Sequence, residues 1–376
     1  GGRATWAMKA EPAKSIDAGA VGAKPGTLSR SMRAEDYDAA GTPDAGKMDA
    51  FIKGLKPNHW TYAPKIPKRP SWRAWNTTAY DPDRKQFLLW GGGHVTYMGT
   101  EISHYSVRSG LWTISYSPDV PHAPTGGFYV KAGLSFNTRP QVPVHAYQAY
   151  AYDPPSGKMF YLSRAYDVRK GEWEAEPYPG LKSSGCMRTL LETTPHGVFA
   201  LSEHGLYKFE AKEKSWKKMP WEGPGFGRAW CDGHALCYDS KRDCLWMAHG
   251  SIMKYDIKTG KVTKSPAARP AVLGKFALWR EQVHIPDADI LLLMRLFKGP
   301  GGKKGNVAWD PASGKYYFVD LPFVDAGGKP AKTGRGFSWS QALHYDRDLK
   351  LAILNTQREP IFLRFDRKTA KMTPIE

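Results

Sequence analysis

The stretch YDPPSGKMFYL, residues 152–162, decides the fold of this chain. An aromatic residue and an acid come first, a turn rich in proline, serine and glycine follows, and an apolar run ends the stretch. Turn residues between two segments of this kind predict a β-hairpin. Because the same pattern starts again at Tyr80, Tyr238 and Tyr345, the hairpin is a repeated unit of the fold.

A second, shorter pattern alternates with the first. It consists of an aromatic residue, an acid, a polar turn and often an apolar residue, as in YDIKTGKV at 255–262, WDPASGKY at 309–316 and FDRKT at 365–369. With looser copies around Tyr105, Tyr166 and Phe209, the second pattern recurs at spacings of 61, 43, 46, 54 and 56 residues. Two hairpins per repeat form a four-stranded antiparallel sheet, and these spacings are close to the period of propeller blades.

We therefore predict an all-β fold, a β-propeller of six or seven four-stranded antiparallel blades. Six first hairpins can be counted, centred near residues 83, 155, 196, 241, 287 and 348. We favour seven blades, because the N-terminal segment and residues 372–376 could supply one more.

The domain organisation follows from where the repeat runs. Residues 47–376 are predicted to form one propeller domain, and residues 1–46, which show no period, a poorly ordered or wrapping tail. At the start of the domain, residues 47–55 predict a short helix. The sequence HWTY at 59–62 predicts a strand that closes the ring against the C-terminal blade.

The chain of 376 residues carries a formal net charge of +18, which attracts polyanions and speeds their encounter. The sequence contains no pattern typical of a nucleic-acid-binding module and no apolar run of membrane-spanning length. We therefore predict an anionic polysaccharide as partner, without nucleic acid or membrane insertion, and a monomeric state. The alternative is that the charge only aids solubility. The start at Gly1-Gly2 is typical of a trimmed or engineered chain, so we expect a secreted or periplasmic protein whose signal peptide has been removed.

Polar residues gather at one predicted end of the propeller. When the four strands of a blade are lettered a to d from the axis outward, the b–c and d–a connections share one end, which we call the loop face. The a–b and c–d turns share the other end, the turn face. The residues predicted for the loop face include His94, His145, Tyr147, Arg164, Glu203, His204, Arg228, Trp230, His249, His284, Arg295, His344 and Arg358. They include six of the 11 histidines. Any one of these could equally satisfy backbone groups, but the whole set predicts a binding surface on a rigid scaffold.

The side chains of the loop face favour one kind of chemistry. A glycosidase normally needs two carboxylic acids, and Glu203 is the only central acid; a nucleophile-elbow motif is also absent from the sequence. β-Elimination from a uronate suits imidazoles, phenols and guanidiniums better. An Arg or His neutralises the carboxylate, and a His or Tyr removes the α proton and protonates the leaving oxygen. This reaction needs no organic cofactor.

Three of the four cysteines lie close together in the sequence. The arrangement Cys231-x-x-His234-x-x-Cys237, with Cys244 shortly after, supplies thiolate and imidazole ligands at a spacing that suits tetrahedral Zn²⁺. We predict a structural zinc site made of these four residues. The competing interpretation is a disulfide between Cys237 and Cys244 across their hairpin.

The repeats resemble the kelch repeats of galactose-oxidase-type propellers. The blade with Gly-Gly-Gly-His94, the blade from His145 to Arg164, Tyr207 and the Cys/His cluster together resemble the propeller ulvan lyases. That resemblance implies a seven-bladed polysaccharide lyase that cleaves a sulfated, uronate-containing algal polysaccharide and holds a structural zinc. It implies His94 as the catalytic histidine, Tyr147 as acid/base and Arg164 as the group that neutralises the carboxylate.

The same resemblance implies Tyr207 as a substrate-binding residue. His145 replaces His104 as the assisting histidine, because His104 falls in a predicted c-strand. We add His204, Arg228, Trp230 and Arg358 as further substrate-binding residues from their place on the loop face.

Two other functions remain open from the sequence. A kelch-type protein that binds a glycan or a protein without catalysis would share the same basic, aromatic face but lack a converged His, Tyr and Arg. A copper oxidase of the galactose-oxidase kind needs a Cys that cross-links to a Tyr, and only Cys186 is free for that role, without a clear partner Tyr.

Overall fold

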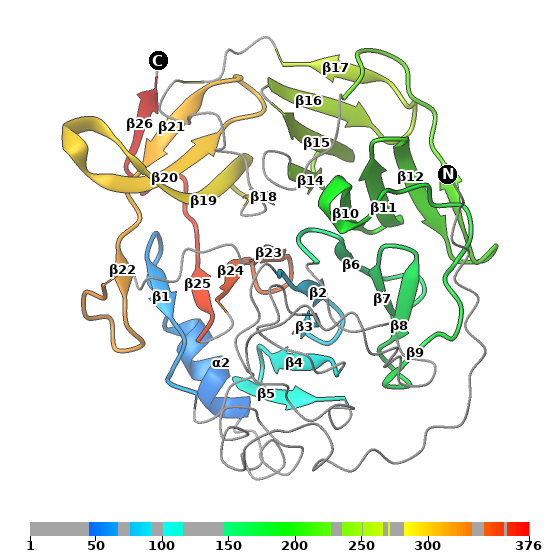
Figure 1. The fold of residues 1–376 in the computed structure, drawn as a ribbon. Helices are drawn as coiled ribbons and strands as arrows, with labels where there is room; N and C mark the ends of the chain where they lie inside the picture. Colours follow the sequence, from blue (N-terminus) through cyan, green and yellow to red (C-terminus); the bar gives the residue numbers. More distant parts are fainter. Residues whose placement is uncertain are drawn as a thin grey trace, which may run out of the picture.

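The computed structural model describes residues 45–66, 76–91, 101–115, 146–226, 235–249, 251–265, 270, 282–332, 342–356 and 359–375. Their strands form six sheets arranged as a ring (Figure 1). The predicted all-β propeller of antiparallel blades is therefore confirmed.

Blades 1 to 4 each contain four strands in sequence order from the axis outward. Blade 1 consists of β2 (Ala79–Asp81), β3 (Gln86–Leu89), β4 (Ser103–Ser106) and β5 (Leu111–Ile114). Blade 2 consists of β6 (Tyr150–Asp153), β7 (Lys158–Tyr161), β8 (Arg164–Asp167) and β9 (Glu172–Trp173). Blade 3 consists of β10 (Thr189–Thr194), β11 (Gly197–Ser202), β12 (Gly205–Glu210) and β13 (Ser215–Lys218). Blade 4 consists of β14 (Ala235–Asp239), β15 (Cys244–His249), β16 (Ser251–Asp256) and β17 (Val262–Lys264).

Blades 5 and 6 each contain five strands, of which one in blade 5 and two in blade 6 come from elsewhere in the chain. Blade 5 consists of β18 (Gln282–Ile285), β19 (Ile290–Lys298), β20 (Lys304–Trp309) and β21 (Tyr316–Val319), with β26 (Met372–Ile375) outside β21. Blade 6 consists of β23 (Ala342–Asp346), β24 (Leu351–Asn355) and β25 (Ile361–Leu363), followed by β1 (Trp60–Tyr62) and β22 (Phe323–Val324).

The inner strands close into a ring of six. Contacts join β2 to β6, β10 to β6 and β14, and β18 to β14 and β23. The last seam, between blades 6 and 1, is made by Tyr80, whose hydroxyl donates to Asp346 at 2.5 Å. Our preference for seven blades was wrong, because six inner strands close the ring and residues 372–375 extend blade 5 as β26. Residues 60–62 lie in blade 6 as β1, and residues 1–44, most of the predicted tail, lie outside the described residues. The strand predicted at residues 59–62 is confirmed, because β1 pairs antiparallel with β25.

The repeated Tyr-Asp pair has a physical reason. In the a–b turn of blade 1, the Asp81 carboxylate accepts hydrogen bonds from the backbone N–H groups of Asp83 at 3.0 Å and Arg84 at 3.1 Å. Such a side-chain-to-backbone bond stabilises a tight turn. The tyrosine of the pair contacts the neighbouring blade. In blade 2, for example, the Tyr152 hydroxyl donates to Asp83 of blade 1 at 3.1 Å. The Tyr-Asp pair therefore stabilises its own turn through the aspartate and the contact with the neighbouring blade through the tyrosine.

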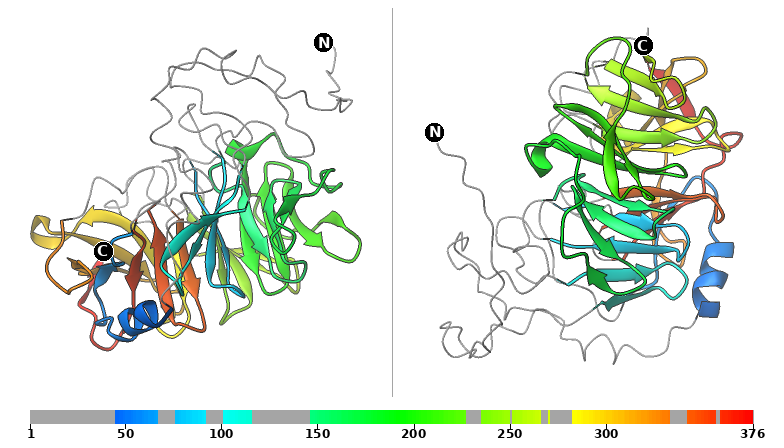
Figure 2. Two further views of the ribbon diagram at one scale, coloured as in Figure 1. Left: turned by 90° about the horizontal axis from the view of Figure 1, so that it is seen from below. Right: turned by 90° about the vertical axis from the view of Figure 1, so that its right-hand side faces the viewer.

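Large apolar side chains fill the seams between the sheets. Trp60, Trp90, Trp112 and Trp309 are all at most 1% exposed, which accounts for these tryptophans as packing residues. Helix α2 (Ala45–Lys53) agrees with the predicted short helix and packs Met48 and Ile52 into the cluster shared by blades 6 and 1. Figure 2 shows this helix against one end of the ring.

Candidate functional site

The strand order confirms which connections meet on the loop face. His94 lies between β3 and β4, His145 between β5 and β6, and Arg358 between β24 and β25, so each falls in a b–c or d–a connection. Arg228 and Trp230 lie between β13 and β14. These five residues lie outside the described residues, so their roles stay predictions. The side chains of His249 and Arg295 are also outside the described part.

Arg164 is the described member of the predicted catalytic set that reaches the surface of the loop face. It opens β8 and pairs with Tyr161 across the two-residue turn that joins β7 to β8. The Tyr161 ring contacts the Trp90 ring of blade 1, with centroids 4.8 Å apart. Residues directly opposite in an antiparallel pair point to the same side of the sheet. Arg164 therefore stands beside an aromatic cluster made by blades 1 and 2, and its side chain is partly exposed.

Tyr147 lies near this hairpin but is enclosed. Its side chain is 5% exposed, and its backbone adopts a left-handed conformation with φ of 47°. Thr77 donates a hydrogen bond to the Tyr147 carbonyl oxygen, and an isolated β-bridge joins Tyr147 to Asn76. Tyr147 therefore links blades 1 and 2 at the loop face, and its acid/base role stays a prediction.

Glu203 and His204 form the b–c turn of blade 3. The Glu203 Oε1 accepts the backbone N–H of Ser184 at 2.9 Å and lies 3.5 Å from His204 Nε2. Burial raises the pKa of Glu203, but the hydrogen bonds from Ser184 and the nearby His204 outweigh it and lower the pKa overall. Glu203 is therefore ionised at neutral pH and unsuited to donate a proton, whereas the His204 side chain is 48% exposed and accessible.

One segment connects these two turns. The backbone N–H of Tyr178 donates to the Ser163 carbonyl in the blade 2 turn at 2.7 Å. Further along, the Lys182 carbonyl accepts the Ser202 hydroxyl at 2.8 Å, and Ser184 binds Glu203 as described. The d–a connection from 174 to 188 therefore holds the loop-face turns of blades 2 and 3 in a fixed relation.

The prediction that Tyr207 binds substrate is corrected. Tyr207 lies in the middle of β12, is 2% exposed and belongs to the core between blades 2 and 3. Its buried hydroxyl has no hydrogen-bond partner among the described residues, and burial together with Glu203 raises its pKa. The alternation of side chains along the strand directs this ring into the seam rather than onto the surface.

Two other histidines, His344 and His104, lie inside strands and are partly buried. His344 was predicted before an a-strand but lies inside β23, where its Nε2 donates to the Thr78 carbonyl at 3.0 Å. His104 lies in the c-strand β4, as predicted, with its Nε2 3.4 Å from the Tyr166 hydroxyl. Burial lowers the pKa of both histidines to about 4, so both rings are neutral at physiological pH.

The predicted zinc site can be followed only for two of its ligands, because Cys231 and His234 lie outside the described residues. Cys237 pairs with Trp246 and Cys244 pairs with Asp239, so the two cysteines are not opposite each other. Both are buried free thiols, and the hairpin disulfide is therefore wrong. Burial raises the pKa of Cys237 and raises that of Cys244 to about 12. Zinc binding would have to displace these protons, and the site remains a prediction.

Cys186 lies beside a tyrosine that the sequence had not pointed to. Its side chain is hydrogen-bonded to Tyr161, whose pKa is raised first by burial and then by Cys186. The pair sits under the same turn that carries Arg164.

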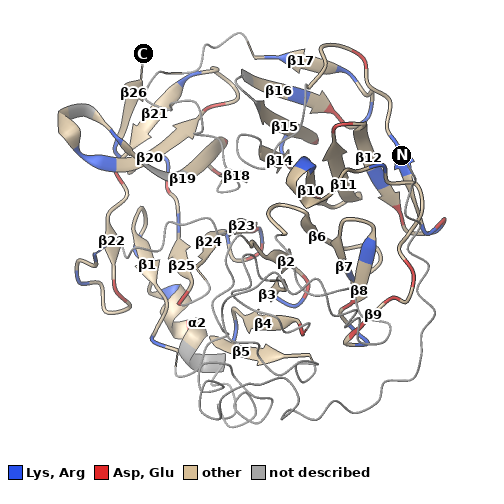
Figure 3. Cartoon of the chain, viewed as in Figure 1, with Lys and Arg blue, Asp and Glu red and all other residues tan. Residues whose placement is uncertain are grey.

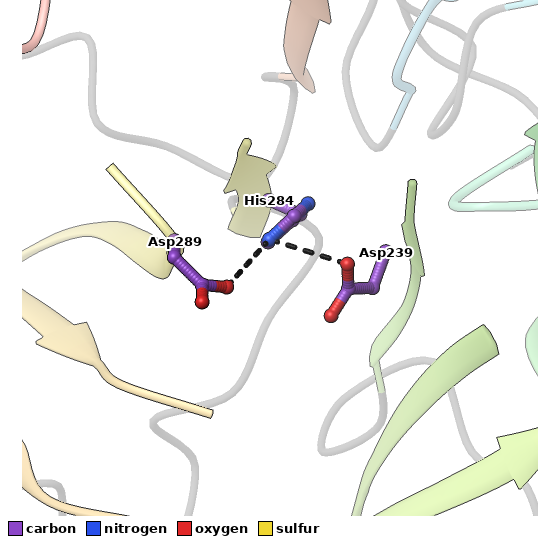
Figure 4. Close-up of side chains that lie close together, drawn as sticks. All are labelled: Asp239, His284 and Asp289. Atoms are coloured by element: carbon purple, nitrogen blue, oxygen red, sulfur yellow. Dashed lines mark ion pairs between the residues drawn. The ribbon is translucent and has the colours of Figure 1, made fainter. Parts of the chain in front are cut away.

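A cluster of two carboxylates and a histidine joins blades 4 and 5 (Figure 4). His284 Nε2 lies 3.3 Å from Asp239 and 3.5 Å from Asp289. The Arg242 guanidinium already bridges both carboxylates, at 2.8 Å and 2.6 Å, and Lys241 reaches Asp289 at 2.8 Å. With two cations in place, these carboxylates need no metal ion for charge balance. Burial lowers the pKa of His284 despite the nearby aspartates, so the cluster is a structural lock between blades.

A cavity lies at the centre of the ring, and no motif in the sequence predicted it. It has a volume of about 610 Å³ and is lined by residues of all six inner strands; we call it the central channel. At its turn-face end it is lined by Asp83, Lys85, Arg108, Arg347 and Asp348. Glu192 of β10 lines its middle and accepts the backbone N–H of Tyr238 at 3.0 Å. Burial raises the pKa of Glu192 to about 8, although the Tyr238 bond and Arg347 oppose this shift.

Charge is not concentrated on one blade of the described structure. Figure 3 shows basic and acidic residues spread around the ring. No helix among the described residues has the length and apolar character needed to cross a membrane.

No family model and no curated protein matches this sequence. Among solved structures, the chain is similar to two structures of the extracellular domain of BT4673 from B. thetaiotaomicron, a putative one component or hybrid two component system. The first is 13% identical, with 74% of this chain and 33% of that chain covered and a TM-score of 0.37. The second is 11% identical, with 81% and 34% covered and a TM-score of 0.40. The chain spans about a third of the length of these structures, and similarity at this level carries no inference about function.

Proposed function

We propose that this β-propeller is a secreted or periplasmic protein that binds an anionic, uronate-containing polysaccharide across its loop face and cleaves it by β-elimination. The observation that carries the proposal is the pairing of two loop-face turns by residues 174–188. This segment places the partly exposed Arg164 of blade 2 and the exposed His204 of blade 3 on the same face of adjacent blades.

These described side chains have complementary tasks in such a reaction. A guanidinium binds a carboxylate through two parallel hydrogen bonds, so Arg164 would neutralise the uronate carboxylate and acidify the α proton. The Trp90 and Tyr161 rings, which are 1% and 9% exposed, pack beside the turn that carries Arg164 and support it from within. The base is one of the loop-face histidines, with His94 and His145 the predicted candidates. His204, held next to the ionised Glu203, is the described histidine placed to assist.

The proposal is tested by ultraviolet absorbance during incubation with uronate polysaccharides, ulvan first. Elimination leaves a C4=C5 double bond, so absorbance rises for a true substrate. We expect Arg164→Ala to lower kcat/KM by at least about 100-fold, because a preorganised cation at a developing charge is worth about 3 kcal/mol or more.

Arg169→Ala is the matched control. Arg169 is exposed in the turn that follows β8, at the turn face, whereas Arg164 begins β8 at the loop face. The control variant should leave the rate unchanged. If the absorbance stays flat while the protein still binds the polymer, the protein is a non-catalytic glycan-binding propeller and not a lyase. A flat trace without binding, in folded protein, would overturn the whole proposal.

A further inference from the structure

The central channel has the features of a second ligand site, distinct from the loop face. Its volume of about 610 Å³ falls in the range of roughly 300–1,000 Å³ typical of small-molecule sites. The lining contains polar atoms that the protein itself leaves without partners. Gln282 is 7% exposed, and its Nε2 has no hydrogen-bond partner in the described part of the chain; the same holds for the buried Oε1 atom of the half-buried Gln148.

A buried polar atom without a partner costs free energy, and a native protein rarely keeps several in one cavity without a use for them. Gln282 begins β18 and Gln148 lies two residues before the blade 2 inner strand β6, so both stand toward the loop-face end of the channel. The amide nitrogen of Gln282 can only donate, and the amide oxygen of Gln148 can only accept. A hydroxyl group can do both in return, so this end of the channel matches a ligand rich in hydroxyls.

The opposite end of the channel matches an anion. Among the described residues, Lys85 is paired with Asp346 and Asp348, whereas Arg108 and Arg347 make no ion pair. Arg347 instead lies over the Tyr238 ring, 5.1 Å from its centroid. Asp83, the remaining acid at this end, accepts the Tyr152 hydroxyl. The lining thus presents more positive than negative charge at the turn face.

Between the two ends, the channel is lined by Tyr80, Tyr150 and Tyr238 and by the carboxyl group of Glu192. Because Glu192 is protonated at neutral pH, it does not repel a negatively charged ligand and can donate a hydrogen bond. The tyrosine rings supply apolar surface, while their hydroxyls donate within the protein to Asp346, the Trp90 carbonyl and Asp243. Hydroxyls at one end, a carboxylate at the other and a compact body between them describe a sugar acid.

We propose that the central channel binds a small acidic saccharide, a mono- or disaccharide that carries one carboxylate, with its hydroxyls at Gln148 and Gln282 and its carboxylate at Arg347. This site does not rest on the proposed function of the loop face. It would respond to a free sugar acid whether or not the protein cleaves a polymer.

The experiment titrates the full chain with D-glucuronate by calorimetry, with D-glucose and acetate as comparison ligands. We expect glucuronate to bind more tightly than glucose, which lacks the carboxylate, and acetate, which lacks the ring, not to bind. Gln282→Leu removes the amide at similar size, and we expect it to weaken glucuronate binding by about tenfold, the effect of one lost hydrogen bond. Arg347→Leu should reduce glucuronate binding to the level of glucose.

Arg164→Ala is the control that separates the two sites. It should leave glucuronate binding in the channel unchanged, and Gln282→Leu should leave any activity on polysaccharides unchanged. Absence of glucuronate binding to folded protein would overturn the channel proposal alone. Unchanged binding in both Gln282→Leu and Arg347→Leu would also overturn it, since the unpartnered amide would then hold only water. Equal binding of acetate and glucuronate would reduce the site to a simple anion site and refute the saccharide.

Discussion

Substitution of Asp239 by alanine tests the physical account of the repeated Tyr-Asp pair. The Asp239 carboxylate is fully buried and accepts the backbone N–H groups of Lys241 at 2.8 Å and Arg242 at 3.1 Å. It also accepts the Trp246 indole N–H at 2.9 Å and the Arg242 guanidinium at 2.8 Å. Asp239→Ala leaves a buried indole donor without a partner and a guanidinium with only Asp289.

The magnitude follows from these contacts. A buried donor without a partner costs about 1–3 kcal/mol, and breaking one side of a buried ion pair costs about 3–5 kcal/mol. Arg242 keeps Asp289, and the turn N–H groups can turn to water, so we expect the free energy of unfolding to fall by about 3–5 kcal/mol in total. Asp239→Asn keeps an acceptor for the turn but loses the charge, and should cost less than the alanine variant.

The matched control is Asp256→Ala in the second pattern of the same blade. Asp256 accepts the Thr259 backbone N–H and hydroxyl, both at 2.9 Å, in an exposed turn. Because those donors can bind water instead, we expect a loss of only about 0.5–1 kcal/mol. Urea unfolding followed by tryptophan fluorescence measures both variants. Equal losses in the two variants, or a loss below about 1 kcal/mol for Asp239→Ala, would refute the inter-blade lock.

Three further predictions follow from the buried titratable groups. The folded-state pKa of His344, about 4, lies below its unfolded value; its stabilising contribution is present above about pH 6.5 and is lost as the pH falls toward 4. The loss of stability reaches up to about 3 kcal/mol. In His344→Gln, the urea midpoint should depend less on pH in this window, whereas His196→Gln at an exposed position should leave its pH dependence unchanged. The pKa of Glu192, about 8, lies above its unfolded value, so stability falls as the pH rises from about 4.5 to 8. Glu192→Gln should therefore stabilise the protein at pH 7 by up to about 3 kcal/mol, and a destabilised variant in urea unfolding would show that Glu192 is ionised. If the predicted zinc site forms, elemental analysis finds one zinc per chain and Cys237→Ser abolishes it; metal-free wild-type protein would leave Cys237 and Cys244 as core thiols.

The fold was largely readable from the sequence because the turns are local. The Tyr-Asp pair forms its own turn within three residues, as at Asp81, so each copy predicts a hairpin without knowledge of the rest. The strand at 59–62 was also predictable, because a single strand before the first blade can form hydrogen bonds only by pairing with the edge strand of another blade. The blade count was not, because the pairing of β26 with β21 joins segments more than 50 residues apart and leaves no local pattern.

The site was less readable than the fold for a related reason. Strand ends could be assigned to a face, which placed Arg164 and His204 correctly. The direction of a side chain within a strand depends on register, so Tyr207 was assigned to the surface although it packs in a seam. The central channel depends on the closure of all six inner strands, and no local segment encodes it.

Strand β1 has a consequence for how the protein is made. It lies between β25 and β22, paired with residues about 300 positions away in the chain. During synthesis, blades 1 to 4 can form as they leave the ribosome, because each uses only consecutive strands. Blade 6 must wait until residues 361–363 are complete, while residues 60–62 remain without a partner. Assembly of the ring is therefore governed by its slowest, most distant contact. Once closed, the ring opens only if β1 is withdrawn from the middle of a sheet, which favours a long-lived native state.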